Sequence, residues 1–354
     1  MKSLFCLLFI FLFTACELPE SNSASAQSSM DVDDYTLETL CTTSDVIWGF
    51  DFISSDEIIF TERGGKLSIC DVKTKTVKPV EGAPAVFAKG QGGLLDILIH
   101  PKTKKIYITF SEKTDLGATT SLFRADLSTD KTKLQNGQVI FKSTADDDTD
   151  MHFGSRVVAD DSDHLFMSIG ERNKRDKAQD PKLHHGKIMR LTLDGNAEIW
   201  SRGHRNTQGL AFDASGKLYN AEMGPRGGDE VNIITKGLNY GWPIITYGNE
   251  YYGPPIGTTH KEGLEQPFLK WVPSISPSGL AFYTGSRLEK FKDNLFLATL
   301  SGQHVHRVVF NKDMTVAKEE QLFVDLKERF RQVKQGPDGT LYFSTDSGKL
   351  YKLY

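Results

Sequence analysis

One pattern recurs along the chain from residue 48 to the end. Each instance has an alternating apolar run, a turn rich in Asp, Gly, Ser or Lys, a second apolar run with aromatic residues, and a third run after another glycine. Such alternation between turn residues is typical of antiparallel strands that follow one another as a meander. The six instances are residues 48–72, 94–127, 155–195, 208–234, 278–310 and 332–354.

The spacing of these instances predicts how the strands assemble. Their starts lie about 45 to 70 residues apart, and a four-stranded propeller blade needs about 40 to 50 residues, which leaves the excess for loops. We therefore expect an all-β chain folded as a six-bladed β-propeller of four-stranded antiparallel blades. The segment 34–41, "DYTLETLC", would supply the strand that completes the last blade. The alternative is an open multi-sheet or two-domain β protein.

The first residues are typical of an export signal. Lys2 precedes an apolar run from Leu4 to Phe13, which is too short to span a bilayer. The sequence "FTAC" then resembles a bacterial lipoprotein processing site, with Cys16 as the residue that would carry lipid. Ordinary cleavage near "SASA" is the alternative. We expect an exported protein, either periplasmic or attached to the outer membrane as a lipoprotein.

This interpretation divides the chain into three parts. Residues 1–16 are the lipoprotein-type signal, residues 17–34 a flexible Ser-rich tether, and residues 35–354 the propeller, which would be the catalytic domain. Cys41 and Cys70 are then the cysteines left in an oxidising compartment. They would form either a disulfide or two separately buried thiols.

Composition excludes one class of partner. Lys and Arg total 42 against 46 Asp and Glu, a net charge of -4, whereas nucleic-acid binding requires a basic excess. The sequence also contains no P-loop, dinucleotide fingerprint, HExxH helix or GxSxG elbow. The chemistry must therefore come from irregular polar loops at the ends of the blades.

The loop "AEMGPRGGDE", residues 221–230, admits three interpretations: a phosphate nest, a metal site built from backbone carbonyls, or a plain corner. A phosphate nest needs consecutive N–H groups at a helix start, but Pro225 removes one N–H and no helix is expected to follow. Carbonyl oxygens beside Asp229 and Glu230 suit calcium better than zinc.

His152 is the candidate base. An imidazole with an ordinary pKa near 6.5 suits proton abstraction at neutral pH, and the small residues Gly154 and Ser155 leave space beside the ring. A hydrogen-bonded structural histidine is the alternative.

Three arginines indicate an anionic ligand. Arg205 lies in "GHRN", and Arg329 and Arg331 are two positions apart, so both point to one face of an extended segment. Two like charges on one face repel unless an anion lies between them, and arginine matches carboxylates in a bidentate geometry. The alternative is a pair of surface arginines bound to Glu328 or Asp325.

Seven motifs in fixed order carry a family resemblance that runs from about residue 48 to the C-terminus. The chain resembles the soluble pyrroloquinoline quinone (PQQ)-dependent aldose sugar dehydrogenases of the glucose/sorbosone dehydrogenase family. The motifs are "QGGLLD...HP", "HFGSR", "GER...RD.AQD...HHGKIMRL", "GHRNTQGLAFD", "GPRGGDEVNII..G.NYGWP..TYG", "PSG.AFY.G" and "ERFRQV..GPDG.LY".

The resemblance implies a six-bladed propeller with the quinone at its channel mouth, oxidation of an aldose to the aldonolactone, and an external electron acceptor. His152 would take the proton of the C1 hydroxyl while hydride passes to the quinone, and Arg205 would polarise the quinone carbonyl. The residues that the resemblance assigns to the PQQ site are Gln91, Arg205, Asn206, Tyr251, Ser301, Arg329 and Arg331. Those that it assigns to calcium are Gly224 and Pro225 beside the quinone, and Glu230 and Tyr240 at a second ion.

Four positions depart from the family pattern. Ser301 replaces a lysine and so removes one cation from the cofactor site, and Glu171 stands where relatives usually have Asp. Met223 stands where His or Gln is usual, and Gln332 replaces an Asp. Two other functions therefore stay open: a calcium-dependent propeller lactonase or hydrolase, and a sugar-binding propeller without catalysis. A monomer and a homodimer both fit the sequence.

Overall fold

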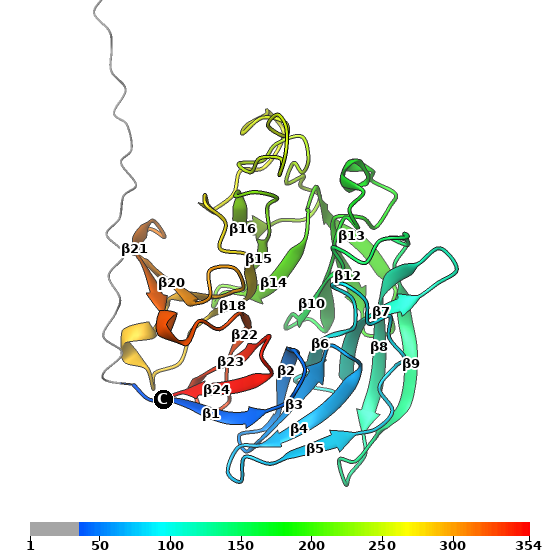
Figure 1. The fold of residues 1–354 in the computed structure, drawn as a ribbon, viewed down its shortest axis with the longest axis vertical. Coiled ribbons are helices and arrows are strands. Elements are labelled where there is room, and N and C mark those ends of the chain that lie inside the picture. Colours follow the sequence, from blue (N-terminus) through cyan, green and yellow to red (C-terminus); the bar gives the residue numbers. More distant parts are fainter. Residues whose placement is uncertain (1–34) are drawn as a thin grey trace, which may run out of the picture.

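Six four-stranded antiparallel sheets make up the structure, a computed structural model that describes residues 35–354. Figure 1 shows the sheets arranged around a common centre, with successive blades following the colours of the chain. The expected six-bladed propeller is confirmed. The predicted signal, Cys16 and the tether lie outside the described residues.

The first three blades follow the chain without interruption. Blade one consists of β2 (Ile47–Ser54), β3 (Glu57–Glu62), β4 (Lys66–Asp71) and β5 (Val77–Val80). Blade two consists of β6 (Leu94–Ile99), β7 (Ile106–Lys113), β8 (Ala118–Leu127) and β9 (Leu134–Lys142). Blade three consists of β10 (Gly154–Ala159), β11 (His164–Ile169), β12 (Lys187–Thr192) and β13 (Ala197–Arg202), with the 3-10 helix η1 (Arg175–Gln179) in its β11–β12 loop.

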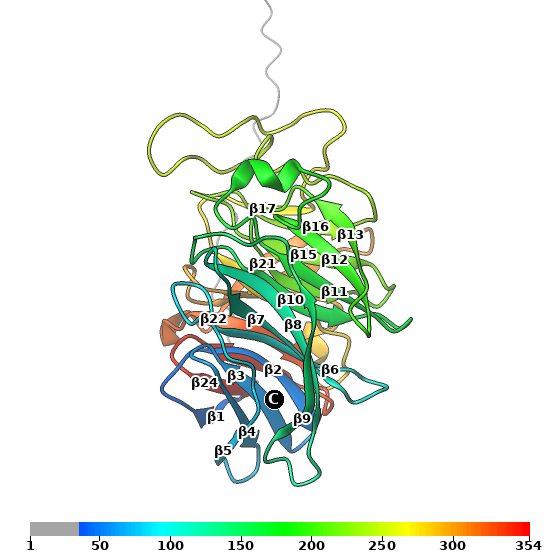
Figure 2. The same ribbon diagram turned by 90° about the vertical axis from the view of Figure 1, so that its right-hand side faces the viewer.

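The remaining blades carry the longer insertions. Blade four consists of β14 (Thr207–Phe212), β15 (Leu218–Glu222), β16 (Asp229–Ile234) and β17 (Leu269–Trp271). Blade five consists of β18 (Pro277–Phe282), β19 (Leu295–Thr299), β20 (Val305–Phe310) and β21 (Val316–Leu322), with 3-10 helices η2 (Glu289–Phe291) and η3 (Val324–Leu326). Blade six consists of β22 (Phe330–Gln335), β23 (Leu341–Thr345), β24 (Lys349–Leu353) and β1 (Leu37–Thr42). In Figure 2 the long segment between β16 and β17 extends beyond the blades as open loops.

The N-terminal strand closes the ring as the sequence predicts. β1 pairs antiparallel with β24, so the last blade takes its outermost strand from the start of the propeller. Cys41 in β1 and Cys70 in β4 form a disulfide, which decides between the two alternatives left by the sequence. The bridge fastens blade six to blade one at the point where the circle closes.

Apolar side chains hold neighbouring blades together. Each of the six larger buried clusters draws residues from two adjacent blades, for example Ile59 and Leu67 of blade one with Leu94 and Ile106 of blade two. Strand alternation explains this, because successive side chains point to opposite faces and each blade is covered on both faces. The hydrophobic core is therefore a series of layers between blades.

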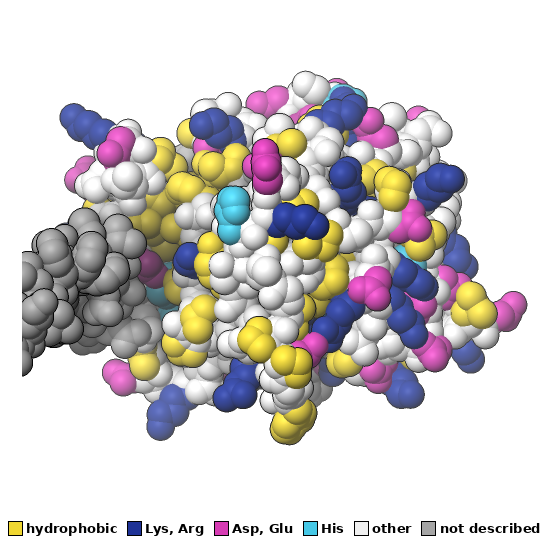
Figure 3. Space-filling view, turned by 90° about the horizontal axis from the view of Figure 1, so that it is seen from above, with side chains coloured by type: hydrophobic (Ala, Val, Ile, Leu, Met, Phe, Trp, Pro, Cys, Tyr) yellow, Lys and Arg dark blue, Asp and Glu magenta, His cyan; other side chains and the backbone are white. Residues whose placement is uncertain are grey.

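The surface is mixed in charge. On the face shown in Figure 3, basic and acidic side chains lie among one another without a continuous region of one sign. Within residues 35–354, no helix is long and apolar enough to cross a membrane.

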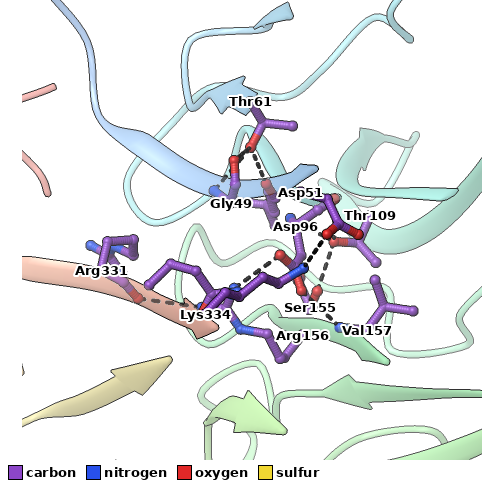
Figure 4. Close-up of polar contacts among 12 residues, drawn as sticks. Gly49, Asp51, Thr61, Asp96, Thr109, Ser155, Arg156, Val157, Arg331 and Lys334 are labelled. Carbon is purple, nitrogen blue, oxygen red and sulfur yellow. Dashed lines mark hydrogen bonds and ion pairs between the residues drawn. The ribbon is translucent and has the colours of Figure 1, made fainter. Parts of the chain in front are cut away.

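A buried ion pair lies where the inner strands meet (Figure 4). Arg156 of blade three donates from Nη1 to Asp96 of blade two at 2.9 Å, and both side chains are at most 1% exposed. Arg156 also donates from Nε to the Gln208 carbonyl at 2.8 Å and from Nη2 to the Arg331 carbonyl at 3.5 Å, and it lies over the Trp48 ring. One guanidinium thus joins groups from blades one, two, four and six to blade three.

Asp96→Asn should lower the free energy of unfolding by about 3 kcal/mol or more. Removing one partner of a buried pair leaves the other charge without compensation in a low-dielectric site. Denaturant unfolding of purified protein measures the effect. The matched control is Asp56→Asn, which breaks the exposed Lys73–Asp56 pair and should change stability by less than about 1 kcal/mol. Equal effects of the two variants would contradict a central role for Asp96.

Candidate active site

A cavity of about 330 Å³ opens where the six inner strands begin. Its lining comes from the segments that lead into all six inner strands, β2, β6, β10, β14, β18 and β22. Closing the propeller brings these starts together, because every inner strand runs in the same direction about the axis. The polar residues that line the cavity are Arg63, Gln91, Asn206, Gln208, Ser276, Arg329, Arg331 and Asp346.

Four predicted cofactor residues line this cavity: Gln91, Asn206, Arg329 and Arg331. Ser301 is exposed and does not line the cavity, but its hydroxyl is 2.7 Å from that of Ser276, which does. Tyr251 is 57% exposed and does not line the cavity.

Arg329 and Arg331 point to one face, as their spacing predicts. Both are bound to Asp346, with Arg329 Nε at 2.9 Å and Arg331 Nε at 2.8 Å from the carboxylate. The expected alternative partners, Glu328 and Asp325, do not pair with them: Glu328 binds Lys349 instead. Asp346 lies in the β23–β24 turn, far along the sequence, and nothing local in the sequence singles it out.

His152 lies beside the cavity and is 6% exposed. Its backbone N–H donates to the Gln91 side-chain oxygen at 2.8 Å, and its Nδ1 is 2.7 Å from Glu171 Oε1. Glu171 is itself held by its N–H, which donates to the Arg205 carbonyl at 2.9 Å. Burial lowers the pKa of His152, and the hydrogen bond to Glu171 partly opposes this effect.

Gly170 makes the histidine–glutamate contact possible. A Cβ on Gly170 would lie 2.0 Å from the His152 carbonyl oxygen, so any other residue would push the two loops apart. His152 itself has a φ of 51°, a left-handed conformation that non-glycine residues adopt only when the surroundings impose it. The close approach therefore fixes both the backbone of His152 and the position of Glu171.

Arg172 contacts the same loop on both sides of His152 in the chain. Its guanidinium lies 3.5 Å from the centroid of the Phe153 ring and donates to the carbonyls of Thr149 and Met151. Arg172 is fully buried. The sequence interpretation gave it no role.

The predicted metal residues gather around a second, much smaller cavity of about 20 Å³. Gly224, Glu230 and Tyr240 line it together with Arg205, and Met223 lines both cavities. Pro225 is buried next to them in the chain but is not part of the lining. The predicted site is therefore divided between two neighbouring cavities that share Met223.

Arg205 lies at the second cavity and not among the residues lining the first. Its Nη1 donates to the carbonyls of Met223 and Gly224, both at 3.0 Å, and its guanidinium is 5.4 Å from the centroid of the Trp242 ring. Burial lowers the pKa of Arg205. The two loop carbonyls therefore face a cationic group in this structure.

A third, larger hollow of about 1000 Å³ lies at the opposite ends of the strands. Its lining includes Asp160 and Asp213, which follow β10 and β14, whereas His152 and Asn206 precede these strands. None of the predicted site residues lines it. We therefore place the site at the smaller axial cavity.

Comparison with known proteins identifies the family. The profile of the family described as Glucose / Sorbosone dehydrogenase matches residues 44–352. The aldose sugar dehydrogenase YliI of Escherichia coli (strain K12) is 37% identical over 342 residues, covering 90% of this chain and 92% of that protein. Quinoprotein glucose dehydrogenase B of Acinetobacter calcoaceticus is 25% identical over 444 residues, covering 95% of this chain and 89% of that protein.

A solved structure agrees with these matches. The soluble aldose sugar dehydrogenase of Escherichia coli in its apo-form superimposes with a TM-score of 0.85 at 36% identity, covering 90% of this chain and 99% of that chain. The fold, the overall sequence identity and the order of the motifs thus all indicate the same family. The chain is an oxidoreductase that belongs to the glucose/sorbosone dehydrogenase family.

Proposed function

We propose that this protein oxidises aldose sugars at C1 to the aldonolactone with PQQ and calcium as cofactors. One observation carries the proposal: an axial cavity lined by arginines and amides lies directly beside a buried histidine–glutamate pair. The names of the two relatives, one for aldose sugars and one for a quinoprotein acting on glucose, support it.

The axial cavity has the chemistry that a polycarboxylate quinone requires. Arg329 and Arg331 offer guanidinium groups that match carboxylates, and Gln91 and Asn206 offer amides to ring oxygens and nitrogens. A cavity of about 330 Å³ is within the range of small-molecule sites, about 300–1,000 Å³. When bound there, PQQ would supply the hydride acceptor.

The second cavity has the oxygen donors that calcium prefers. The Met223 and Gly224 carbonyls already converge on the guanidinium of Arg205. Asn232 donates to both Glu222 and Glu230, and its own buried side-chain oxygen has no hydrogen-bond donor among the described residues. Within residues 35–354, no three His, Cys, Asp or Glu side chains gather as a metal cluster. Such a site suits a hard cation bound largely through carbonyls.

His152 would accept the proton of the C1 hydroxyl. Glu171 is acceptor-only when ionised, so the proton on the histidine faces it from Nδ1 and the lone pair is on Nε2. Because burial lowers the pKa of His152, the ring is neutral and able to act as a base at neutral pH. The Glu171 carboxylate would then stabilise the imidazolium that forms.

We further propose that the electrons leave to an acceptor outside the cytoplasm. The export signal and Cys16 of the sequence interpretation support this location, and both lie outside the described residues. A lactonase or a non-catalytic sugar-binding propeller would need no quinone, so cofactor binding separates these functions from the dehydrogenase.

Reconstitution tests the function directly. Apo-protein purified without residues 1–34 should reduce an artificial dye with aldoses only when both PQQ and calcium are added. Assays that omit one cofactor at a time, and a panel of aldoses, define the requirement. Absence of dye reduction, together with an unchanged PQQ absorption spectrum on mixing, would overturn the proposal.

His152→Gln should lower kcat by about 10² or more and leave PQQ affinity unchanged, because the variant loses the base but keeps the cavity. In the wild-type protein, the acid limb of kcat/KM should lie below pH 6.5, since the pKa of His152 is lowered from its ordinary value of 6.5. The control is His260→Gln on the exposed blade-four loop. Wild-type turnover in His152→Gln would remove this residue from the mechanism.

Glu230 should make the calcium-free protein less stable as the pH rises. Burial and the nearby Glu222 raise the pKa of Glu230 from 4.5 to about 8. Between these two values the folded protein binds more protons than the unfolded chain, so the free energy of unfolding falls through this window.

In EDTA at pH 9, Glu230→Gln should therefore be more stable than the wild type by up to about 5 kcal/mol, and the two should converge below pH 4.5. Denaturant unfolding across pH measures both, with the exposed Glu262→Gln as control. A wild-type stability that rises from pH 5 to pH 8 relative to Glu230→Gln would contradict the assignment.

A further inference from the structure

The axial cavity contains a cation that the motifs did not single out. Arg63 lines it together with Arg329 and Arg331. The family resemblance had indicated one positive charge fewer at the cofactor site, because Ser301 replaces a lysine that relatives carry. Ser301 contributes a hydroxyl bound to Ser276 and no charge.

The backbone of Arg63 is fixed on both sides. Arg63 lies in the turn between β3 and β4, where its N–H donates to the Val46 carbonyl and its carbonyl accepts from the Leu94 N–H, both at 3.0 Å. Gly93 packs against it so closely that a Cβ there would lie 2.0 Å from the Arg63 carbonyl oxygen. The position of the Arg63 Cα is therefore set by blades one and two.

The Arg63 guanidinium contacts the loop that contains Gly90 and Gln91, directly before β6. Its Nη1 donates to the Gly90 carbonyl, next to Gln91, and both of these residues line the cavity. Burial is the main cause that lowers the pKa of Arg331, and the charges of Arg329 and Arg63 lower it further. The Arg331 guanidinium is thus close enough to Arg329 and to Arg63 to be repelled by both.

The charges around the cavity do not balance. Its charged lining residues are three arginines and one aspartate. Arg329 and Arg331 share the Asp346 carboxylate, whereas Arg63 has no carboxylate within 4.0 Å among residues 35–354. The neighbouring Asp45 carboxylate is occupied by the N–H groups of Val46 and Gly64. The lining thus carries an excess of positive charge, which an anion with several carboxylates would neutralise. A further carboxylate, that of Asp150, lies against Gly90 and is not part of the lining.

We propose that Arg63 is a ligand of the cofactor carboxylates and supplies, from blade one, the positive charge that Ser301 no longer supplies from blade five. This inference rests on the proposed function, because it assigns a role toward PQQ. Arg63 binds a carboxylate at the rim of the cavity while Arg329 and Arg331, already shared with Asp346, bind the others. The site thereby keeps three cations for a three-carboxylate ligand.

Arg63→Gln should weaken PQQ binding to the apo-protein by about 10-fold or more, since a guanidinium–carboxylate contact is lost. Isothermal titration calorimetry in calcium measures the dissociation constant without any turnover. Benzene-1,3,5-tricarboxylate, which has the carboxylates but no quinone, should lose affinity by a similar factor. The control is Arg287→Gln, an exposed arginine after β18 on another blade, which should bind both ligands as the wild type does.

A second experiment restores the lysine at position 301. Ser301→Lys introduced into Arg63→Gln should recover at least about 3-fold of the lost PQQ affinity. Arg63→Lys keeps a charge without the bidentate fork, so its affinity should lie between those of the wild type and Arg63→Gln. If Arg63→Gln does not fold, as judged by its thermal transition, Arg63→Lys carries the test.

The outcomes separate the two proposals. Wild-type PQQ affinity in Arg63→Gln, or in Arg63→Lys where that variant carries the test, overturns the role of Arg63 and leaves the proposed function intact. An equal loss in Arg287→Gln also overturns it, because net charge would then explain the effect. If PQQ affinity does not recover in the Arg63→Gln, Ser301→Lys double variant, the claim that Arg63 supplies the charge missing at position 301 is overturned. A wild-type protein that does not bind PQQ overturns the proposed function and this inference together.

Discussion

The buried pair of Arg156 and Asp96 is the interaction on which the architecture of the axis depends. A charged group without water is tolerated only when other groups satisfy it, and Arg156 meets this demand with a carboxylate, two carbonyls and the face of Trp48. These partners come from four blades other than that of Arg156. The requirement to satisfy one guanidinium therefore fixes how the inner strands meet, and it sets the floor beneath the axial cavity.

The candidate site is built on this floor from segments that provide both structural support and reactive side chains. Gln208 and Arg331 give backbone carbonyls to Arg156 and lend their side chains to the cavity. The His152 loop is fixed between Gly170 and Arg172. Support and chemistry are thus adjacent in the chain, which places reactive groups with little freedom of their own. The second cavity is built in the same way, because the carbonyls of residues that line it hold the Arg205 guanidinium in place.

Sequence reasoning found the parts of the site that lie in motifs. Gln91, His152, Asn206, Arg329 and Arg331 lie in or beside the axial cavity as a group. It missed Arg63 and Arg156, whose partners come from other blades, and Asp346, whose partners lie in the same blade across the pairing of β22 with β23. A charged residue inside an otherwise buried strand, as Arg156 is, was the one available signal. The sequence interpretation also assigned Arg205 to the cofactor, which stays a prediction; in the structure its guanidinium lies against the Met223 and Gly224 carbonyls.

The sequence by itself determined the six meanders, the closing strand and the order of the motifs, because alternation and turn chemistry are local properties. The family also follows from motif order. Only the tertiary structure decided that Cys41 and Cys70 are joined, that Asp346 serves both Arg329 and Arg331, and that two cavities share Met223. The disulfide and the shared lining depend on how neighbouring blades meet, and the Asp346 contacts depend on strand pairing within blade six. In each case tertiary packing brings together residues whose spacing in the chain carries no information about their distance.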